Sequence, residues 1–445
     1  MLQSHSYPRE LVSFIYDLWK DPQFSEGLRS IGMDSSFQLP DRSLFEHMIS
    51  VSYQASLARE ETRPLMFRLI LRPPELLPAD MGPPTGLHPL TFTRPRCFNE
   101  QELCKLAPAA DFNRTLIGIC LDQELKPRIW GLIHSGTRWT QTVFGGRNIV
   151  PSLPPSLVIH VTGPGQVSVC LGPEMIASLN GGHINRPSPD IFTAQWLTAS
   201  FVKIRHKMRA LHAMARTQSK KPWAFLDHDF SKNLEQQTVR RIVGMIRNSR
   251  HGGLLIYLPT NSGHDFDAEN SIIKIKYPFY DDEPRQRFVT LIVRIMNTLA
   301  EIYGDPNNPE ICVGWQEYVA CQNEEIALLD EAIFDVAHFI ASLAATDGAV
   351  VMTEQLELLG FGGFVLGDSD RVEMVRRAFD PEGEHTELQR IEMVGTRHRA
   401  AYRLCQKVHD AMAIVISQDG DMQLVKWVNN ALTYWKLSPS GVVEF

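Results

Sequence analysis

Two arginines, a histidine and a threonine occupy four consecutive positions within the stretch Val394–Ala401, which reads Val-Gly-Thr-Arg-His-Arg-Ala-Ala. Arginine offers a planar fork of donors that matches phosphate oxygens. Gly395 and Thr396 precede a predicted helix that begins with alanines, and the first N–H groups and the dipole of such a helix attract anions. This stretch has the chemistry of a polyphosphate cradle, and the simpler alternative for a lone Arg-x-Arg is a solvated basic helix start.

Two other stretches add chemistry to this cradle. Asp347 and Gly348 stand before the apolar run 349–352, which leaves the carboxylate open to a metal or a hydroxyl group. Taken alone, Asp-Gly is more often only a turn. Gly252 and Gly253 enter the apolar run 254–258, which alone indicates nothing more than a core strand.

In this order the three stretches resemble the diadenylate cyclase domain, a family that joins two ATP molecules into cyclic di-AMP. Its hallmarks are a Gly-Ala-Leu-Ile strand, then Asp-Gly-Ala, then Gly-Thr-Arg-His-Arg-x-Ala. The matching residues here are 253–256, with Leu254 in place of alanine, 347–349 and 395–401. Residues 414–418, Ile-Val-Ile-Ser-Gln, resemble the strand that closes the domain. The resemblance covers about Trp223 to Leu424.

The resemblance implies a nucleotidyl transfer in which the ribose 3′-hydroxyl of one ATP attacks the α-phosphorus of another. Asp347 would hold Mg²⁺ or Mn²⁺ near that hydroxyl, because carboxylate and phosphate oxygens suit these ions. The implied catalytic residues are Asp347, Gly348, Arg397, His398 and Arg399. The implied ATP-binding residues are Ala349, Leu366, Gly395, Thr396, Arg397, His398, Arg399 and Ser417.

Two departures from the family pattern concern the metal. Thr346 stands where some members place a histidine before Asp-Gly-Ala, and Ser417-Gln418-Asp419 replaces Ser-Glu-Glu. The DNA-integrity-scanning type of cyclase lacks that histidine and has Ser-Gln, so neither change argues for inactivity. They leave the second metal ligand open. A cyclic product needs two ATP-loaded domains that face each other, so we expect a homodimer or higher homo-oligomer.

Composition narrows the class of protein. The chain has 445 residues and a net charge of −7, which predicts two or three domains and gives no general attraction to nucleic acid. Its seven cysteines form no Cys-x-x-Cys pair, so no zinc site or disulfide framework is indicated. No secretory signal pattern and no apolar run long enough for a bilayer is visible. We expect a cytoplasmic protein without a membrane anchor.

Residues 1–192 predict an α+β domain that would act as a sensor or regulatory domain for an unknown small-molecule or protein signal. Helical spacing fills the first 60 residues, and residues 72–95 are predicted to be mainly loop. Glycine-rich stretches at 145–147 and 180–183 are either ligand loops or, more simply, tight turns. Strands are predicted at 66–71, 115–121, 128–132, 156–161 and 165–171.

Residues 193–222 predict a connecting helix. Its apolar residues recur with heptad-like spacing; they are Leu197, Phe201, Ile204, Met208, Leu211 and Ala215. This spacing fits either a two-chain coiled coil or an ordinary amphipathic helix that packs on its own domain. Residues 223–445 predict the cyclase-like domain, with a central mixed β-sheet flanked by helices. Insertions are expected at about 264–335 and 367–392, the second as a helix with a mobile loop near the site.

The expected function is therefore a diadenylate cyclase controlled by an N-terminal sensor domain. One alternative is a catalytically silent nucleotide-binding sensor that reports ATP or cyclic di-AMP. Another is a related cyclase that makes a different cyclic dinucleotide. Asp347 favours an enzyme, because binding alone would not require that carboxylate.

Overall fold

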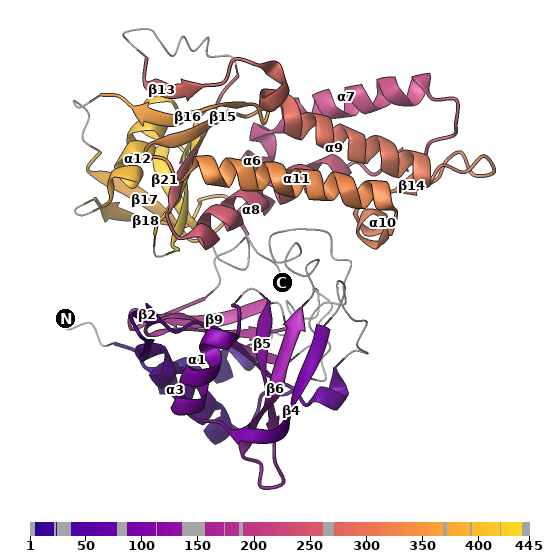
Figure 1. The fold of residues 1–445 in the computed structure, drawn as a ribbon. Helices are drawn as coiled ribbons and strands as arrows, with labels where there is room; N and C mark the ends of the chain where they lie inside the picture. The colour runs from indigo at the N-terminus through magenta and orange to yellow at the C-terminus, as the bar shows by residue number, and fades with distance from the viewer. Residues whose placement is uncertain are drawn as a thin grey trace. The chain divides into compact units, whose positions relative to one another are not determined.

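The computed structural model describes two compact units, an N-terminal unit up to Arg186 and a C-terminal unit from Asp190 to Leu437. The described residues are 5–21, 24, 37–77, 87–112, 114–135, 156–172, 174–186, 190–260, 271–367, 372–391, 394–418 and 420–437. Both units combine helices with β-sheets (Figure 1), so the predicted α/β class is confirmed. No helix in these ranges is long and apolar enough to span a membrane.

The N-terminal unit is built on an eight-stranded sheet in the order β10-β9-β8-β7-β3-β5-β6-β4. Alternate side chains of its strands, such as Phe67, Leu69 and Ile117, join one apolar core with helix residues such as Leu11 and Phe45. The helices are α1 (Pro8–Trp19), α3 (Arg42–Leu57) and α4 (Glu100–Leu106). The sheet strands are β3 (Phe67–Leu71), β4 (Leu87–Cys97), β5 (Thr115–Leu121), β6 (Pro127–Ser135), β7 (Leu157–Gly163), β8 (Gln166–Leu171), β9 (Glu174–Asn180) and β10 (His183–Asn185), and β1 (Arg59–Glu60) pairs separately with β2 (Arg63–Pro64).

The loop predicted for residues 72–95 is wrong in its second half, because Leu87 begins the long strand β4. Pro89 and Pro95 suggested a loop, but β4 is the last strand of the sheet, and an edge strand tolerates proline because one side of it needs no ladder hydrogen bonds. The tight-turn interpretation of residues 180–183 is confirmed, since Gly181 and Gly182 connect β9 to β10. The stretch 145–147 lies outside the described residues.

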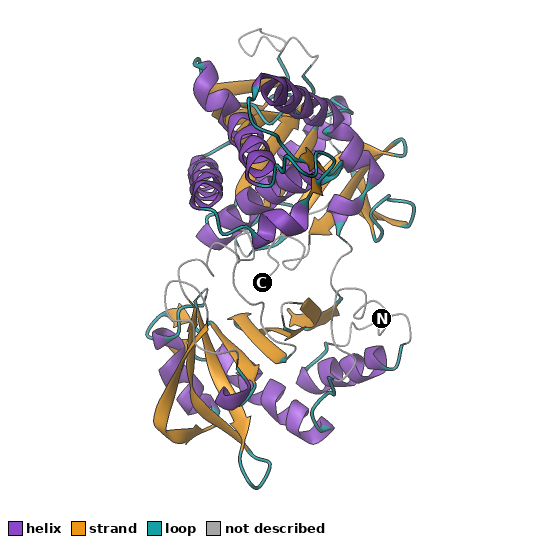
Figure 2. Cartoon of the chain, turned by 90° about the vertical axis from the view of Figure 1, so that its right-hand side faces the viewer, coloured by secondary structure: helices purple, strands orange, loops and turns teal. Residues whose placement is uncertain are grey.

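The C-terminal unit is built on a nine-stranded mixed sheet in the order β13-β16-β15-β12-β19-β20-β21-β17-β18, and Figure 2 shows its helices packed around the strands. The strands are β12 (Gly253–Leu258), β13 (Ile273–Pro278), β15 (Ala349–Thr353), β16 (Leu358–Val365), β17 (Met374–Ala378), β18 (Thr386–Arg390), β19 (Met412–Ile416), β20 (Met422–Val428) and β21 (Ala431–Leu437). The helices are α6 (Gln195–Ser200), α7 (Val202–Gln218), α8 (Phe230–Ser249), α9 (Asp282–Ile302), α10 (Trp315–Ala320), α11 (Glu324–Leu343) and α12 (Thr396–Lys407), and a short pair joins β11 (Phe225–Leu226) to β14 (Cys312–Val313).

Helices cover the central strand β12 on both faces. On one face Leu254 and Ile256 share a core with Ala401 and Leu404 of α12. On the other face the backbone of Gly253 packs against Ile246 of α8 and Ala344 at the end of α11. All six residues of β12 are buried, which explains why its sequence is a continuous apolar run rather than an alternating one.

The predicted connecting helix is two helices, α6 and α7, that meet at Phe201. The first four residues of its apolar stripe pack inside the C-terminal unit, and Leu211 is 39% exposed. Leu197, Ile204 and Met208 are buried, and the ring of Phe201 contacts the ring of Tyr257 on β12. A buried ion pair fixes the helix further, with Arg205 Nη1 of α7 2.7 Å from Glu235 Oε2 of α8. Within this chain, α7 is therefore an amphipathic helix packed on its own unit.

The helix predicted within residues 367–392 is wrong. Met374–Ala378 and Thr386–Arg390 form an antiparallel hairpin, β17–β18, that extends the sheet beyond β21. Val375 and Ala378 turn inward, while the charged residues between and after them stay at the surface. The hairpin is separated from β19 by β20 and β21, so it does not lie beside the strand ends that carry the site.

Candidate functional site

The three sequence motifs meet where the central strands of the C-terminal sheet end. We call this place the sheet edge, and it is the side on which β12 and β15 begin and β19 ends. Strand β12 runs parallel to β15, with Leu255 opposite Val350, and antiparallel to β19, with Gly253 opposite Ile416. Gly252 directly precedes β12, Asp347 lies two residues before β15, and Ser417 directly follows β19. These pairings therefore bring all three residues to the same edge of the sheet.

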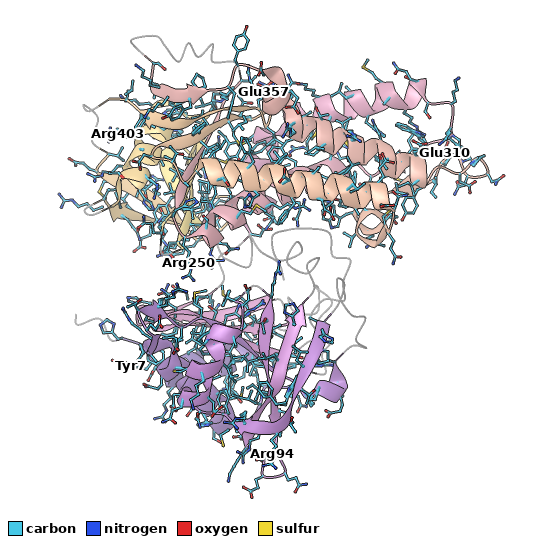
Figure 3. The ribbon with its side chains drawn as sticks, in the orientation of Figure 1. Tyr7, Arg94, Arg250, Glu310, Glu357 and Arg403 are labelled. Atoms are coloured by element: carbon cyan, nitrogen blue, oxygen red, sulfur yellow. The ribbon has the colours of Figure 1, made fainter. Side chains whose placement is uncertain are left out.

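Helix α12 begins at the same edge. Its N-cap Gly395 has an extended backbone and supplies no side chain to cap the helix. The first N–H groups therefore stay available to an anion, in a helix whose first turn carries Thr396, Arg397 and His398. Arg403 Nη1 donates a 2.7 Å hydrogen bond to the carbonyl oxygen of Gly367, at the margin of the unit where Figure 3 labels Arg403. This bond, together with the buried side of α12, fixes the direction in which its N-terminus points.

Arg397 reaches from α12 over Gly252. Its Nη1 atom lies 2.9 Å from the point that a Cβ on Gly252 would occupy. The same point lies 2.8 Å from the carbonyl oxygen of Ile416 and 3.2 Å from the backbone nitrogen of Gln418. Gly252 also has φ +67°, a conformation that favours glycine. The glycine before β12 thus makes the room in which the guanidinium group of Arg397 lies.

Asp347 lies at the surface, and it makes no hydrogen bond or ion pair with the described part of the chain. The neighbouring Gly348 has φ +106°, and a Cβ there would lie 2.7 Å from the carbonyl carbon of Gly362 on β16. The turn is therefore packed tightly against the next strand. This packing holds the Asp347 backbone in place while its carboxylate stays accessible. Ala349 is 1% exposed, and its contact with a nucleotide stays a prediction.

The remaining predicted residues lie around this row with different exposure. Ser417 begins the turn between β19 and β20, where its Oγ donates to the carbonyl oxygen of Asp421 over 3.0 Å. Leu366 follows β16 and is 41% exposed. Thr396 and Arg399 are exposed, and His398 is half-buried near the ring of Tyr402. The structure thus brings the predicted residues to one sheet edge, and the ATP contacts of Leu366 and Ser417 stay predictions.

Arg247, in the last turn of α8, is a basic residue near this edge that the motifs did not indicate. Its Nε atom lies 3.6 Å from the Cβ position of Gly420, in the turn that follows Ser417. Among the described residues it makes no hydrogen bond or ion pair. Burial, with a smaller effect from Arg250, lowers its pKa to about 10, against the opposing effect of Asp421. The only sequence signal was Arg247-x-x-Arg250 directly before the two glycines, which also fits an ordinary helix end.

A buried polar network fixes the two helices that lead into the site. Arg241 Nη2 of α8 lies 2.6 Å from Asp330 Oδ1 of α11, and Tyr318 donates a 2.9 Å hydrogen bond to the same oxygen. Helix α8 leads to Gly252, and α11 leads to Asp347. The network therefore sets the spacing of the two chain segments that enter the candidate site.

The donor set near Asp347 limits the metal that it could hold. No group of three or more histidine, cysteine or acidic side chains that could bind a metal occurs in the ranges described above. A single accessible carboxylate suits Mg²⁺ or Mn²⁺, which take their other ligands from phosphate oxygens and water. It does not suit a zinc site, which needs three or four protein ligands.

Comparisons with known protein families agree with this division of the chain. Residues 335–427 match the family model described as DisA bacterial checkpoint controller nucleotide-binding, a range that contains Asp347, Arg397 and Ser417. Residues 34–134 match the model described as Probable sensor domain DACNV. No curated protein matches the chain. Part of the C-terminal unit is therefore similar to that nucleotide-binding domain, and part of the N-terminal unit is similar to that probable sensor domain.

Proposed function

We propose that the C-terminal unit is an active diadenylate cyclase that condenses two ATP into cyclic di-AMP and two pyrophosphates, and that the N-terminal unit controls it. One observation carries the proposal: Asp347, Gly252 and Ser417 lie at the sheet edge where α12 begins, and Arg397 of α12 reaches over Gly252. A carboxylate beside a phosphate cradle is the combination that nucleotidyl transfer needs.

The basic residues act on the phosphates. Negative charge spreads over the phosphate oxygens as the ribose 3′-hydroxyl attacks and pyrophosphate leaves, so fixed positive groups stabilise the transition state. Arg397 is positioned by α12 and by the room above Gly252. The uncapped N–H groups of α12 add donors for a phosphate oxygen. His398 and Arg399 extend the same turn of the helix.

Asp347 acts near the ribose 3′-hydroxyl that attacks the α-phosphorus. A divalent Mg²⁺ or Mn²⁺, when bound, lowers the pKa of that hydroxyl and neutralises phosphate charge. Asp347 would hold this ion through its accessible carboxylate. The tight packing of Gly348 on Gly362 keeps the carboxylate at a fixed place on the sheet edge, which serves orientation.

A complete reaction needs a second copy of the chain. Each domain binds one ATP, and both 3′-hydroxyls must attack, so two sites have to face each other. We propose a homodimer or higher homo-oligomer as the active form.

Two alternatives share the same cradle. In a silent sensor of ATP or cyclic di-AMP, an unpaired carboxylate near the phosphates would only repel the ligand. Asp347 is accessible and has no hydrogen bond or ion pair within the described ranges, which favours the enzyme. A cyclase for another dinucleotide would use the same phosphate and metal chemistry with a different base.

The test is incubation of the purified full chain with Mg²⁺ or Mn²⁺ and each of the four nucleoside triphosphates, followed by mass spectrometry. We expect cyclic di-AMP and pyrophosphate from ATP alone. ATP binding without any product would support the silent sensor, and a cyclic product from another triphosphate would support the related cyclase.

A further inference from the structure

We propose that the N-terminal unit binds a small apolar molecule with an amine head in a pocket between the start of α3 and the ends of strands β3, β5 and β7. We call it the α3 pocket. It has a volume of about 560 Å³ and is lined by Phe37, Gln38, Pro40, Asp41, Ser43, Leu44, Leu71, Leu121, Glu124, Leu125 and Leu157. This volume is typical of small-molecule sites. All of these residues except Leu157 lie within the range that matches the probable sensor domain.

One wall of the pocket is apolar because three strands end there. Leu71 at the end of β3 lies opposite Leu157 at the start of β7, and Leu121 ends the neighbouring strand β5. Phe37 and Leu44 supply the wall on the side of α3. The part of a ligand that contacts these walls is therefore hydrocarbon or aromatic, and polar groups of the ligand would face Gln38, Asp41, Ser43 and Glu124.

The mouth of the pocket is also apolar. Leu121 is 38% exposed, and Leu125, in the turn after β5, is 72% exposed. Leu125 also has φ +58°, a conformation that is unfavourable for a leucine. A bound apolar molecule would remove both side chains from water, and this burial would contribute to its affinity.

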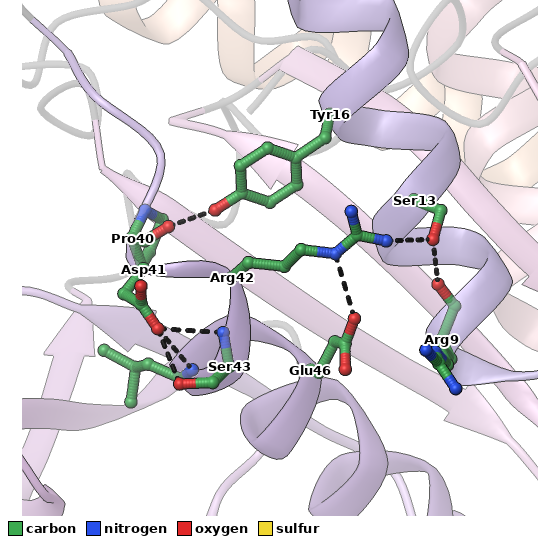
Figure 4. Close-up of polar contacts among 9 residues, drawn as sticks. Arg9, Ser13, Tyr16, Pro40, Asp41, Arg42, Ser43 and Glu46 are labelled. Carbon is green, nitrogen blue, oxygen red and sulfur yellow. Dashed lines mark hydrogen bonds and ion pairs between the residues drawn. The ribbon is translucent and has the colours of Figure 1, made fainter.

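The polar end of the pocket is acidic. Asp41 caps α3 through Oδ1, which accepts hydrogen bonds from the backbone nitrogens of Ser43 and Leu44 and from Ser43 Oγ (Figure 4). The Ser43 hydroxyl is the largest of the effects that lower the pKa of Asp41, so this carboxyl stays ionised near neutral pH. Its second oxygen, Oδ2, takes part in none of these bonds. A ligand amine could therefore bind Oδ2 without disturbing the helix cap.

Basic side chains near the pocket are committed elsewhere. Arg42 donates to Ser13 Oγ of α1 at 2.5 Å and pairs with Glu46 Oε1 of α3 at 3.1 Å (Figure 4). Lys126 pairs with Glu124 of the lining at 2.6 Å, so Asp41 is the lining carboxylate that has no ion pair among the described residues. The described lining includes no lysine, arginine or histidine. The acidic, base-free lining favours a cation and disfavours phosphates, nucleotides and fatty acids.

The wall of the α3 pocket contacts Trp19, whose fluorescence can report the binding of a ligand. Tyr16 donates a hydrogen bond to the carbonyl oxygen of Pro40, which holds the segment before α3 against α1. The Trp19 ring lies edge-on to the Phe37 ring, with centroids 5.9 Å apart. A molecule that contacts Phe37 should therefore change the fluorescence of Trp19, and Trp19→Phe shows which part of the signal comes from this tryptophan.

The test titrates the full chain with three probes of equal length, decylamine, decanol and decanoate, below their aggregation concentrations. Isothermal calorimetry and Trp19 fluorescence report the binding. We expect decylamine to bind about tenfold more tightly than decanoate, since one charge-assisted contact near solvent has this order of effect. Equal affinity for the three probes, tighter binding of decanoate, or no binding at all would overturn the proposal.

Two variants locate the binding. Asp41→Asn keeps a good helix cap but removes the charge, so it should abolish the preference for the amine while decanol affinity stays the same. Leu125→Asn removes apolar surface at an exposed turn without changing the charge or touching the core, and it should weaken all three probes about fivefold or more. Leu57→Asn, at the 51% exposed end of α3, is the matched control and should change nothing. Unchanged binding in both pocket variants would place the probes elsewhere and would refute the assignment.

Discussion

The guanidinium group of Arg397 and the backbone of Gly252 occupy neighbouring space, with Arg397 Nη1 2.9 Å from the Cβ position of the glycine. Two motifs that lie far apart in the sequence therefore depend on each other in the fold. The glycine leaves room for the arginine, and the arginine carries its charge to the sheet edge that also holds Asp347. The next prediction tests this dependence.

Gly252→Ala should strongly reduce both ATP affinity and product formation. Its methyl group would meet the Ile416 carbonyl oxygen and Arg397 Nη1 at 2.8 and 2.9 Å, and the residue has φ +67°. We expect a stability loss of about 1–3 kcal/mol in addition to the displacement of Arg397. Gly181→Ala is the matched control, because Gly181 has φ +58° but nothing within 4 Å of its Cβ position. Equal behaviour of the two variants in ATP calorimetry would remove the role given to Gly252.

Arg397→Ala and Arg399→Ala should each weaken ATP binding. Each removes a charge-assisted phosphate contact worth about 1.5–3 kcal/mol when the contact is fully formed. Each replacement should raise the dissociation constant of ATP about tenfold to a hundredfold. The increase should be larger for the half-buried Arg397 than for the exposed Arg399. Arg294→Ala, on the exposed side of α9, is a control for the loss of one positive charge. If both variants bind ATP as the control does, the phosphates bind elsewhere.

Arg247→Gln should weaken the binding of pyrophosphate and ATP severalfold without lowering stability. The side chain is a cation with a depressed pKa of about 10, and it makes no hydrogen bond or ion pair with the described residues, so its replacement by glutamine breaks no polar contact among them. Thermal unfolding and calorimetry with each ligand separate the two effects. A destabilised variant with unchanged ligand affinity would show that Arg247 serves only the end of α8.

Much of the fold could be predicted because the patterns are local. The runs at 115–121, 253–258 and 324–343 are the strands and the helix that apolar spacing indicates. The site motifs stand out because phosphate and metal chemistry require arginine and carboxylate. The approach of Arg247 to Gly420 could not be predicted, since it depends on how a helix end meets a distant turn.

Edge elements were the hardest to predict, for a physical reason. The β17–β18 hairpin exposes one face to water, so its charged residues resemble a solvated helix as closely as a strand. Strand β4 carries two prolines that only an edge position permits. In both cases the tertiary position, rather than the local sequence, decides the conformation.

The pH dependence of stability should reveal the buried ion pair of α7 and α8. Burial raises the pKa of Glu235 to about 7 from its ordinary value of 4.5, against the opposing effect of Arg205. The folded state then holds a proton that the unfolded state has released, so the contribution to stability is complete below about pH 4.5 and is lost as the pH rises through 7.

Glu235→Gln removes this titration, so the stability of the wild type relative to the variant should fall between pH 5 and pH 8. Hydrogen exchange of the α8 amides measures this difference within the C-terminal unit. Thr290→Val on α9, where the hydroxyl contacts only the carbonyl oxygen of Gln286, is a control without a titrating group. A constant difference between wild type and Glu235→Gln across this range would contradict the assignment.

The most direct test of the central claim is the turnover of Asp347→Asn in the full chain with ATP and Mn²⁺, measured as cyclic di-AMP by mass spectrometry. The side chain is exposed and lacks protein partners among the described residues, so the variant should fold as the wild type does. We predict that it still binds ATP in calorimetry but makes no cyclic di-AMP, because the amide cannot neutralise the metal ion beside the 3′-hydroxyl. Turnover close to that of the wild type would contradict the role of Asp347 and, with it, the proposed active site.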